Sequence, residues 1–371
     1  MMIMRWTVKS LLREPMALLG GAAAIAAALV LVMLFEAIWQ GESSQVIAYV
    51  RKADADVWVM QKGVSNMHMA TSLLDSWKES SVAEISGVAD VTPILYMNTI
   101  VQVGNRNWFA YVVGLAPDAR RGGPWDIAQG EARAQPGETV IPAMMATISE
   151  VKVGDAVQVA NKTFRISGLS NGTFSMANPV LFVHADDLRE ILSAYGFVSY
   201  LLVKAQPGVA PAALAARIRE QVNNVSALPR DAFVQSDYEM AIMMGSELIG
   251  IFTAIGAVLA VLLVAFTLYT HTIRRRRELA ILKALGFRQH HIYAGVLFEA
   301  IVLMAVGFML ACLLALGGVY LTSLIAPQVT MQLTGTIVAK VGLVGTGVAL
   351  LATLIPARQI ARIDPQLVFQ S

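Results

Sequence analysis

Apolar and polar stretches alternate along the chain in long blocks. Pro15 to Phe35 and Leu248 to Thr270 contain no charged residue, and two later blocks of similar length contain one each. A helix of about 20 apolar residues crosses the hydrocarbon core of a bilayer. We therefore predict four transmembrane helices, in residues 1–40 (with a short basic segment before the helix), 247–273, 292–321 and 335–356.

The first apolar block also has an alternative interpretation, a cleaved signal peptide, because a basic start and an Ala-rich core are common to both. Its apolar run is longer than the usual 7–15 residues of a signal peptide. The following Phe35 to Gln40 contains no small-x-small cleavage site. We therefore expect a retained helix.

Residues 41–246 are polar by comparison and mix charges, Gly, Pro and β-branched residues, which is typical of a folded soluble domain. Strand-like patterns at Asp56–Met60 and Val91–Val103 flank a helical pattern at about Leu73–Ile85. A second such unit has a strand at Ser199–Lys204, a helix at Ala210–Val222 and a strand at Ala232–Gln235. The sequence predicts two β-α-β units that pair into one α+β sub-domain.

A β-rich insertion of about residues 105–190 separates the two units. Turn signals such as Asn161-Lys162 and Asn171-Gly172 divide it into short segments. Short strands at this spacing indicate a small β-barrel or sandwich. We expect its strands at Thr139–Ile141, Ala156–Ala160, Thr163–Leu169 and Pro179–Val183, after a loop over Pro117–Gly137.

Charge fixes the expected topology. Residues 41–246 carry 16 Lys/Arg against 20 Asp/Glu, whereas the segments 1–14, 271–291 and 357–371 together carry 11 against 3. Basic loops stay on the cytoplasmic side. We expect both termini in the cytoplasm of a bacterial inner membrane, the large domain outside, and a short outer loop at 322–334. Basic residues so placed indicate membrane orientation, and no nucleic-acid partner is expected.

Composition agrees with a membrane protein: 56% of the 371 residues are hydrophobic, 15% are charged, and the mean hydropathy is +0.59. The single cysteine, Cys312, excludes an intramolecular disulfide. This leaves the compartment to be argued from topology.

The basic segment 274–291 stands out between the second and third helices. Four arginines precede a run of strong helix formers with Leu279, Leu282 and Leu285 three apart, and Gly286 is a plausible helix stop. We predict a short helix at the inner membrane surface with one apolar face. The arginines that fix topology and could touch anionic lipid are Arg274, Arg275, Arg276 and Arg277.

Motifs of catalysis are missing from the sequence. There is no G-x-x-x-x-G-K-S/T phosphate loop, no H-E-x-x-H or C-x-x-C metal pattern and no G-x-S-x-G elbow. We expect no catalytic residue, no metal and no cofactor in this chain, so any ATP and Mg would be bound by a partner. His290-His291 is interpreted as an interfacial pair.

Two ionisable residues lie within predicted spans. Lys340 is near the outer end of its helix, where its long side chain can extend to water. Glu299 is deeper, and burying its charge requires a partner. We expect a hydrogen bond or ion pair with the basic segment, at Arg275 or Lys283, and weigh a proton-relay role as the alternative.

The basic run followed by Phe298-Glu299-Ala300 resembles the signature of FtsX/MacB-type ABC transporter permeases, the transmembrane subunits of type VII ABC transporters. The end of the chain resembles that family's closing P-A-R-x-A-A-x-x-x-P motif, here with Pro356, Ala357, Arg358 and Pro365. The layout of one helix, a large outer domain and three helices is similar as well. Ala280 stands where many members have Gly.

The resemblance implies a permease that works as a homodimer, or paired with a related permease, on separate ABC ATPase subunits that bind ATP and Mg. It could also use a periplasmic adaptor, and it would contact membrane lipid. ATP hydrolysis would then move the outer domain to export or extract a lipid, lipoprotein, peptide or drug. The residues that the resemblance assigns to a coupling helix are Glu278, Leu279, Ala280, Ile281, Leu282, Lys283, Ala284, Leu285 and Gly286.

Two other functions are compatible with the sequence. The same motion could regulate an outer-surface enzyme or sensor without any transport. A non-ABC membrane receptor is the second alternative, in which the basic segment contacts an unrelated protein. For the amphipathic helix itself, the alternative to coupling is a membrane-surface anchor.

Overall fold

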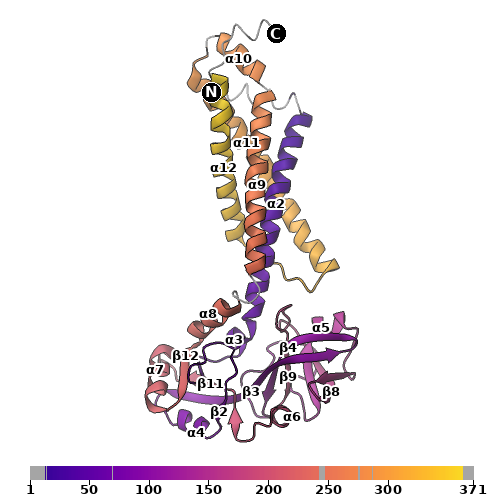
Figure 1. Ribbon diagram of the computed structural model, residues 1–371, viewed down its shortest axis with the longest axis vertical. Helices are drawn as coiled ribbons and strands as arrows, with labels where there is room; N and C mark the ends of the chain where they lie inside the picture. The colour runs from indigo at the N-terminus through magenta and orange to yellow at the C-terminus, as the bar shows by residue number, and fades with distance from the viewer. Residues whose placement is uncertain are drawn as a thin grey trace. The chain divides into compact units, whose positions relative to one another are not determined.

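The computed structural model describes residues 13, 15–68, 70–241, 247–274, 276–285 and 287–361. The chain divides into two compact units. The membrane unit comprises residues 1–40, 248–326 and 331–371. The outer domain comprises residues 41–247 and 327–330. Each unit is described by itself (Figure 1).

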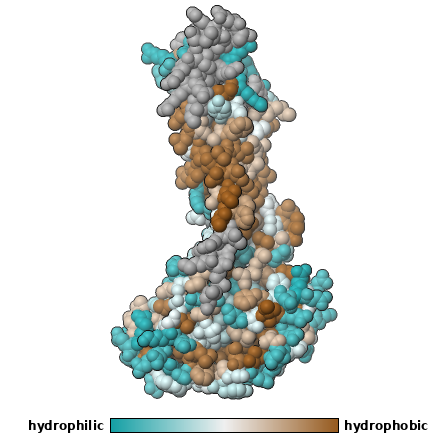
Figure 2. Space-filling view, viewed as in Figure 1, coloured by the Kyte–Doolittle hydropathy of each residue, from teal (hydrophilic) through white to brown (hydrophobic). Residues whose placement is uncertain are grey.

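Four long apolar helices make up the membrane unit, as the hydropathy pattern predicts. They are α2 (Pro15–Val46), α9 (Glu247–Arg274), α11 (Gln289–Ile325) and α12 (Gly335–Ala361). Apolar surface gathers over these helices in Figure 2. A short helix, α10 (Arg276–Ala284), lies between α9 and α11.

The helices run further than the sequence indicates. The third one extends to Ile325, into the stretch predicted as an outer loop. The fourth continues to Ala361, past Pro356, which the sequence placed at its end. Transmembrane helices tolerate proline when neighbouring groups satisfy the freed backbone atoms.

Small residues bring three of these helices close together. The α-carbon of Gly307 in α11 faces α2, where an added Cβ would lie 2.8 Å from Cγ2 of Ile25. An added Cβ at Gly342 in α12 would lie 2.9 Å from Cζ of Phe308. Close backbone approach of this kind lets van der Waals contacts hold membrane helices together.

The first part of the outer domain is a sheet with helices on both faces (Figure 1). Its strands are β1 (Val57–Gln61), β11 (Tyr200–Ala205), β12 (Val225–Pro229) and the first half of β3 (Val88–Val103), in the antiparallel order β12-β1-β11-β3. The helices are α3 (Ala48–Lys52), α4 (Lys78–Ala83), α7 (Pro211–Gln221) and α8 (Arg230–Ala241).

Side chains alternate between the two faces of this sheet, as strand geometry requires. Val57 and Val59 of β1 pack in the same cluster as Leu214 and Ile218 of α7. Trp58 lies on the opposite face, in a cluster with α3 and α8. Burial on both faces explains why the strand reads as a continuous apolar run.

The second part is a β-barrel, which confirms one of the two predicted forms. Its strands pair in the closed ring β3-β4-β9-β6-β8-β7. Alternate residues of these strands, such as Val101, Val112, Phe164 and Leu181, form one buried cluster. The barrel elements are β4 (Arg106–Leu115), β5 (Ile127–Gly130), β6 (Glu138–Pro142), α5 (Ala143–Ile148), β7 (Ala156–Val159), β8 (Lys162–Ser170), β9 (Val180–His184) and α6 (Ala185–Leu192).

Two predicted elements of the outer domain are wrong. The helix expected at Leu73–Ile85 is only α4, because Leu74–Asp75 (β2) pairs with Phe197–Val198 (β10). Ala232–Gln235, predicted as a strand, lies inside α8, and the strand of that unit is β12. A four-residue apolar run does not distinguish strand from buried helix by its pattern.

Candidate functional site

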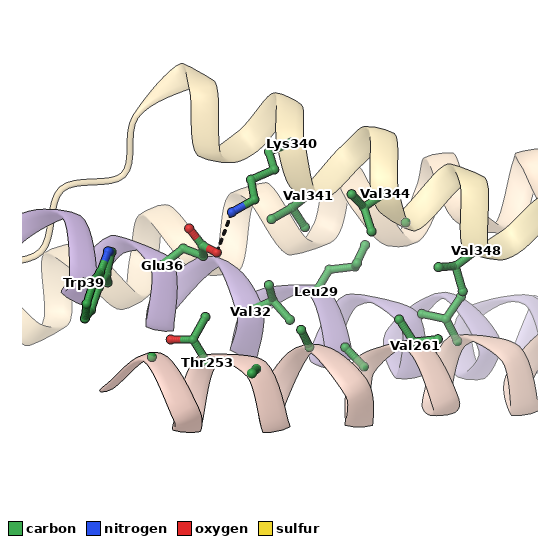
Figure 3. Close-up of a pocket in the computed structure, with 16 residues that line it drawn as sticks. Leu29, Val32, Glu36, Trp39, Thr253, Val261, Lys340, Val341, Val344 and Val348 are labelled. Carbon is green, nitrogen blue, oxygen red and sulfur yellow. Dashed lines mark hydrogen bonds and ion pairs between the residues drawn. The ribbon is translucent and has the colours of Figure 1, made fainter. Parts of the chain in front are cut away.

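An apolar groove of about 470 Å³ lies between α2, α9 and α12 in the membrane unit (Figure 3). One helical face of each helix lines it, because the contributing residues recur three or four apart. Most of the α9 residues that line the groove are small, and they leave its space free. Larger residues of α2 and α12 form its other walls. The lining includes Leu29 and Val32 of α2, Ala254 and Ala257 of α9, and Val344 and Val348 of α12.

Polar groups gather at the end of the groove where α2 finishes and α12 begins. The Nζ atom of Lys340 lies 2.8 Å from Oε1 of Glu36, as Figure 3 shows. Trp39 and Thr253 lie at the same end, and the Thr253 hydroxyl has no hydrogen-bond partner among the described residues. The long side chain of Lys340 therefore reaches an acidic partner, which its interpretation as a water-seeking lysine did not include.

The chemistry of the groove suits an amphiphile. Its walls are aliphatic, so they offer a hydrocarbon chain the same contacts as lipid and no hydrogen bonds. Its charged end offers an ammonium, a carboxylate and a hydroxyl to a polar headgroup. Nothing in this arrangement is a nucleophile aligned with a base, so binding is the activity that it supports.

The second candidate site is α10, the helix predicted to couple to an ATPase. Its apolar residues do not share one face as the sequence indicated. Leu282 is 7% exposed and packs on Ile292 and Val296 of α11, whereas Ile281 and Leu285 are 40% and 71% exposed. These two residues are four apart, so they form an outward apolar patch.

The other predicted coupling residues are placed as follows. Glu278 and Lys283 are half-buried in α10, and the backbone of Leu279, Ala280 and Ala284 is helical. Gly286 lies outside the described residues. Of the four arginines, Arg274 ends α9 and is exposed, Arg276 and Arg277 begin α10, and Arg275 lies outside the described residues.

Glu299 is 4% exposed on α11, on the same buried face as Val296 and Leu303. Its pairing with Lys283 stays a prediction, and a pairing with Arg275 lies outside the described residues. In the closing motif, the backbone of Pro356, Ala357 and Arg358 belongs to α12. Pro365 lies outside the described residues.

Within the described ranges, no three His, Cys, Asp or Glu side chains gather in a way that could hold a metal ion. His290 and His291 are both exposed, with ring centroids 4.1 Å apart. Their interpretation as an interfacial pair stays a prediction.

Comparison with known families identifies the architecture. Residues 16–221 match the MacB-like periplasmic core domain, and residues 250–365 match the FtsX-like permease C-terminal domain. This chain belongs to the MacB/FtsX family of ABC transporter permeases. Members of this family are transmembrane subunits, and an ABC permease implies an ATPase partner. The MacB/FtsX resemblance seen in the sequence motifs is thereby confirmed.

Several curated relatives have related sequences over most of this permease. An uncharacterized ABC transporter permease of Mycobacterium tuberculosis is 25% identical over 319 residues, which cover 85% of this chain and 84% of the relative. The pyoverdine export ATP-binding/permease protein PvdT of Pseudomonas aeruginosa is 24% identical over 389 residues. That match covers 95% of this chain but 55% of PvdT, which is longer.

Two solved structures are similar in part. The periplasmic region of MacB from Actinobacillus actinomycetemcomitans has a TM-score of 0.38 and 14% identity, and the match covers 50% of this chain and 93% of that one. The extracellular domain of the noncanonic ABC-type transporter YknZ from Gram-positive bacteria has a TM-score of 0.37 and 8% identity. Its match covers 47% of this chain and 100% of that one.

Sequence reasoning missed Glu36 as a site residue of this MacB/FtsX permease. Glu36 and Lys340 are 304 positions apart, and each looked like an ordinary interfacial charge at a helix end. One signal could have found the pair. When two opposite charges lie at the outer ends of two apolar spans, an ion pair between them lowers the free-energy cost of placing them in the membrane.

Proposed function

We propose that this permease converts ATP hydrolysis by a separate ABC ATPase into movement of its outer domain, and that it exports or extracts an amphiphilic substrate such as a lipid, lipoprotein, peptide or drug. ATP and Mg would be bound by the ATPase. The permease itself would act as a homodimer, or paired with a related permease, in the bacterial inner membrane with both termini cytoplasmic.

The observation that carries this proposal is that the apolar residues of the segment 276–285 point in two directions, one towards α11 and two outwards. Leu282 anchors the helix to α11, so a push on α10 reaches the membrane helices through packed side chains. Ile281 and Leu285 remain exposed one turn apart and offer an apolar patch to a groove of the ATPase. A membrane-surface anchor would need an apolar face but no such rigid connection to α11.

The groove supports the substrate class. Its aliphatic walls and charged end match a molecule with a hydrocarbon part and a polar head. The helices α2 and α9 both line it, and the chain of each continues into the outer domain. A change in the groove and a movement of the outer domain can therefore be linked through these helices. A periplasmic adaptor would receive the substrate beyond this point.

The coupling proposal is tested by purifying the permease with its ATPase. Leu285→Arg places a charge in the patch and is expected to abolish both copurification and the permease-dependent part of ATP hydrolysis. Leu73→Arg is the matched control, since Leu73 is also an exposed leucine, 41% exposed, but lies in the outer domain. Normal ATPase association of Leu285→Arg would contradict coupling through α10.

Transport is tested separately from coupling. Vesicles reconstituted with the permease and its ATPase, with ATP enclosed, are expected to lose fluorescent lipid or drug to an external acceptor. ATP hydrolysis without any such movement would instead favour a regulator that switches an outer-surface partner. Equal movement with a hydrolysis-deficient ATPase would contradict ATP-driven transport.

A further inference from the structure

A buried histidine in the outer domain lies in a hydrogen-bond network that the proposed function does not use. His68 is 8% exposed, and its Nδ1 lies 2.9 Å from Oδ1 of Asp237 in α8, a residue that is 1% exposed. The backbone N–H of Met67 donates to the same oxygen at 2.7 Å. The loop around residue 68 is thereby held to α8, the last helix before α9 in the chain.

On its other side the histidine meets an amide. Asn178 is 4% exposed, and its Nδ2 lies 3.4 Å from Nε2 of His68 and 3.2 Å from the carbonyl oxygen of Val46. Val46 is the last residue of α2. The network therefore touches both segments that lead towards membrane helices, the end of α2 through Asn178 and α8 through Asp237.

The contacts on the two ring nitrogens of His68 differ in kind. A carboxylate only accepts hydrogen bonds, so Nδ1 of His68 must carry the proton that faces Asp237. The amide nitrogen of Asn178 only donates, so Nε2 must present its lone pair. With the amide oriented so that Asn178 donates to Val46, these contacts suit a neutral imidazole.

A second proton changes these contacts in a defined way. A proton added from solvent to Nε2 would point at the amide N–H₂ of Asn178. Two hydrogen-bond donors would then face each other, which is unfavourable. The amide must then turn its oxygen to the imidazolium. That oxygen would face the carbonyl of Val46, so the link to α2 is lost, while the contact with Asp237 becomes an ion pair and strengthens.

The titratable groups around the network are Asp237 of α8, Tyr96 of β3, Tyr111 of β4 and Tyr200 of β11. Glu42 lies one turn before Val46 on α2, where it accepts from the backbone N–H of Thr330 at 2.9 Å. Burial raises the pKa of each of these tyrosines above its usual range, so they stay neutral in acid and at neutrality. Histidine is the side chain whose charge ordinarily changes between pH 5 and 8.

We propose that His68 is a proton-operated latch on the end of α2: neutral His68 keeps Asn178 bound to Val46, and protonated His68 releases it while α8 stays held. Acid would then loosen the last turn of α2, residues 41–46 of the outer domain, without loosening α8. The consequence for transport rests on the proposed function, because a looser tie transmits less movement. The latch itself does not require an ATPase.

The test is hydrogen exchange of the full chain in detergent, without ATPase, from pH 5 to 8, with rates corrected for intrinsic exchange. Protection of residues 41–53 is expected to fall about three- to tenfold in acid, the range that one buried hydrogen bond supports. Residues 230–241 are expected to keep their protection. Asn178→Ala is expected to give the low protection of 41–53 at every pH.

His68→Gln replaces the imidazole with an amide that binds no proton in this range. The protection of residues 41–53 is then expected not to change with pH. His184→Gln is the matched control, because His184 is also buried in the outer domain and its Nδ1 accepts from the N–H of Asp186 at 3.2 Å, away from Val46. A wild-type profile that does not change with pH would overturn the latch. So would a pH response that survives in His68→Gln or in Asn178→Ala, and the wild-type and Asn178→Ala series suffice if His68→Gln does not fold.

Discussion

Lys340 and Glu36 neutralise each other at one end of the membrane groove, with Nζ of the lysine 2.8 Å from Oε1 of the glutamate. The side chain of Lys340 is 62% exposed and that of Glu36 is 20% exposed. An isolated carboxylate is costly in a bilayer, so the glutamate depends more on this pair than the lysine does. The pair therefore ties α12 to α2 at the polar end of the groove.

The first prediction concerns this charge pair. Lys340→Met leaves the Glu36 carboxylate without its cation and is expected to lower the unfolding free energy in mixed micelles by about 1 kcal/mol, the upper range for a partly exposed pair. Glu36→Gln is expected to lose less, because Lys340 can extend to water. The exchanged pair, Glu36→Lys with Lys340→Glu, is expected to be more stable than the sum of its two single charge reversals, and strictly additive effects of these two reversals would contradict a direct interaction.

A second prediction separates the groove from the rest of α9. Ala257 lines the groove, whereas its neighbour Val258 does not and is 59% exposed. Ala257→Trp is expected to fill the space and to weaken binding of a fluorescent fatty acid or lysolipid at least tenfold, measured by titration of the reconstituted permease. Val258→Trp adds the same ring to the adjacent position and is expected to leave the affinity within about twofold, since it faces away. Equal affinities for the two variants would exclude the groove as the binding site.

Much of the fold could be predicted from the sequence because two strong signals encode it. Absence of charge over Leu248–Thr270 marks a membrane helix whatever its neighbours are, and strand alternation in Thr163–Leu169 marks a barrel wall. The short helix α10 followed from the apolar spacing after Glu278. Its detailed faces did not, because Leu282 turns towards Ile292, and that contact depends on how α11 packs.

The rest depended on contacts between distant residues. His68 and Asp237 are 169 positions apart, and neither lies in a recognisable motif. The segment at Ala232–Gln235 is short and apolar, so its pattern suited a strand. In α8 its Phe233 and Asp237 lie four apart on one inward face, which only the surrounding core makes favourable. Tertiary packing overrides local preference at such positions.

A third prediction tests this inward face of α8. Phe233 is fully buried and its ring stacks on that of Trp58 at a centroid distance of 4.9 Å. Phe233→Ala is expected to cost about 3–5 kcal/mol and to lower the Tm of the outer domain by roughly 10 °C, followed by near-UV circular dichroism of the full chain. Phe109→Ala removes an equal volume from a ring that is 51% exposed, and its effect is expected to stay below about 1 kcal/mol. Similar melting of both variants would contradict the burial of Phe233 against Trp58.

The last prediction concerns helix packing in the membrane unit, where α11 offers two glycines as a matched pair. A Cβ added at Gly307 would lie 2.8 Å from Cγ2 and 2.9 Å from Cβ of Ile25, and 3.1 Å from the carbonyl oxygen of Ala22, whereas a Cβ at Gly317 would meet nothing within 4 Å. Gly307→Ala must therefore push α11 away from α2.

We expect Gly307→Ala to lower the unfolding free energy in mixed micelles by about 1–3 kcal/mol, as overpacking does in tightly packed cores. Gly317→Ala is expected to be neutral or to stabilise by up to about 1 kcal/mol, because alanine restricts the unfolded chain and favours the helix. The two substitutions are chemically identical and lie in the same helix, so helix propensity alone predicts the same sign for both. Opposite signs are expected from the close approach of Ile25 and Ala22 of α2 to Gly307, and stabilisation by both variants would contradict that contact.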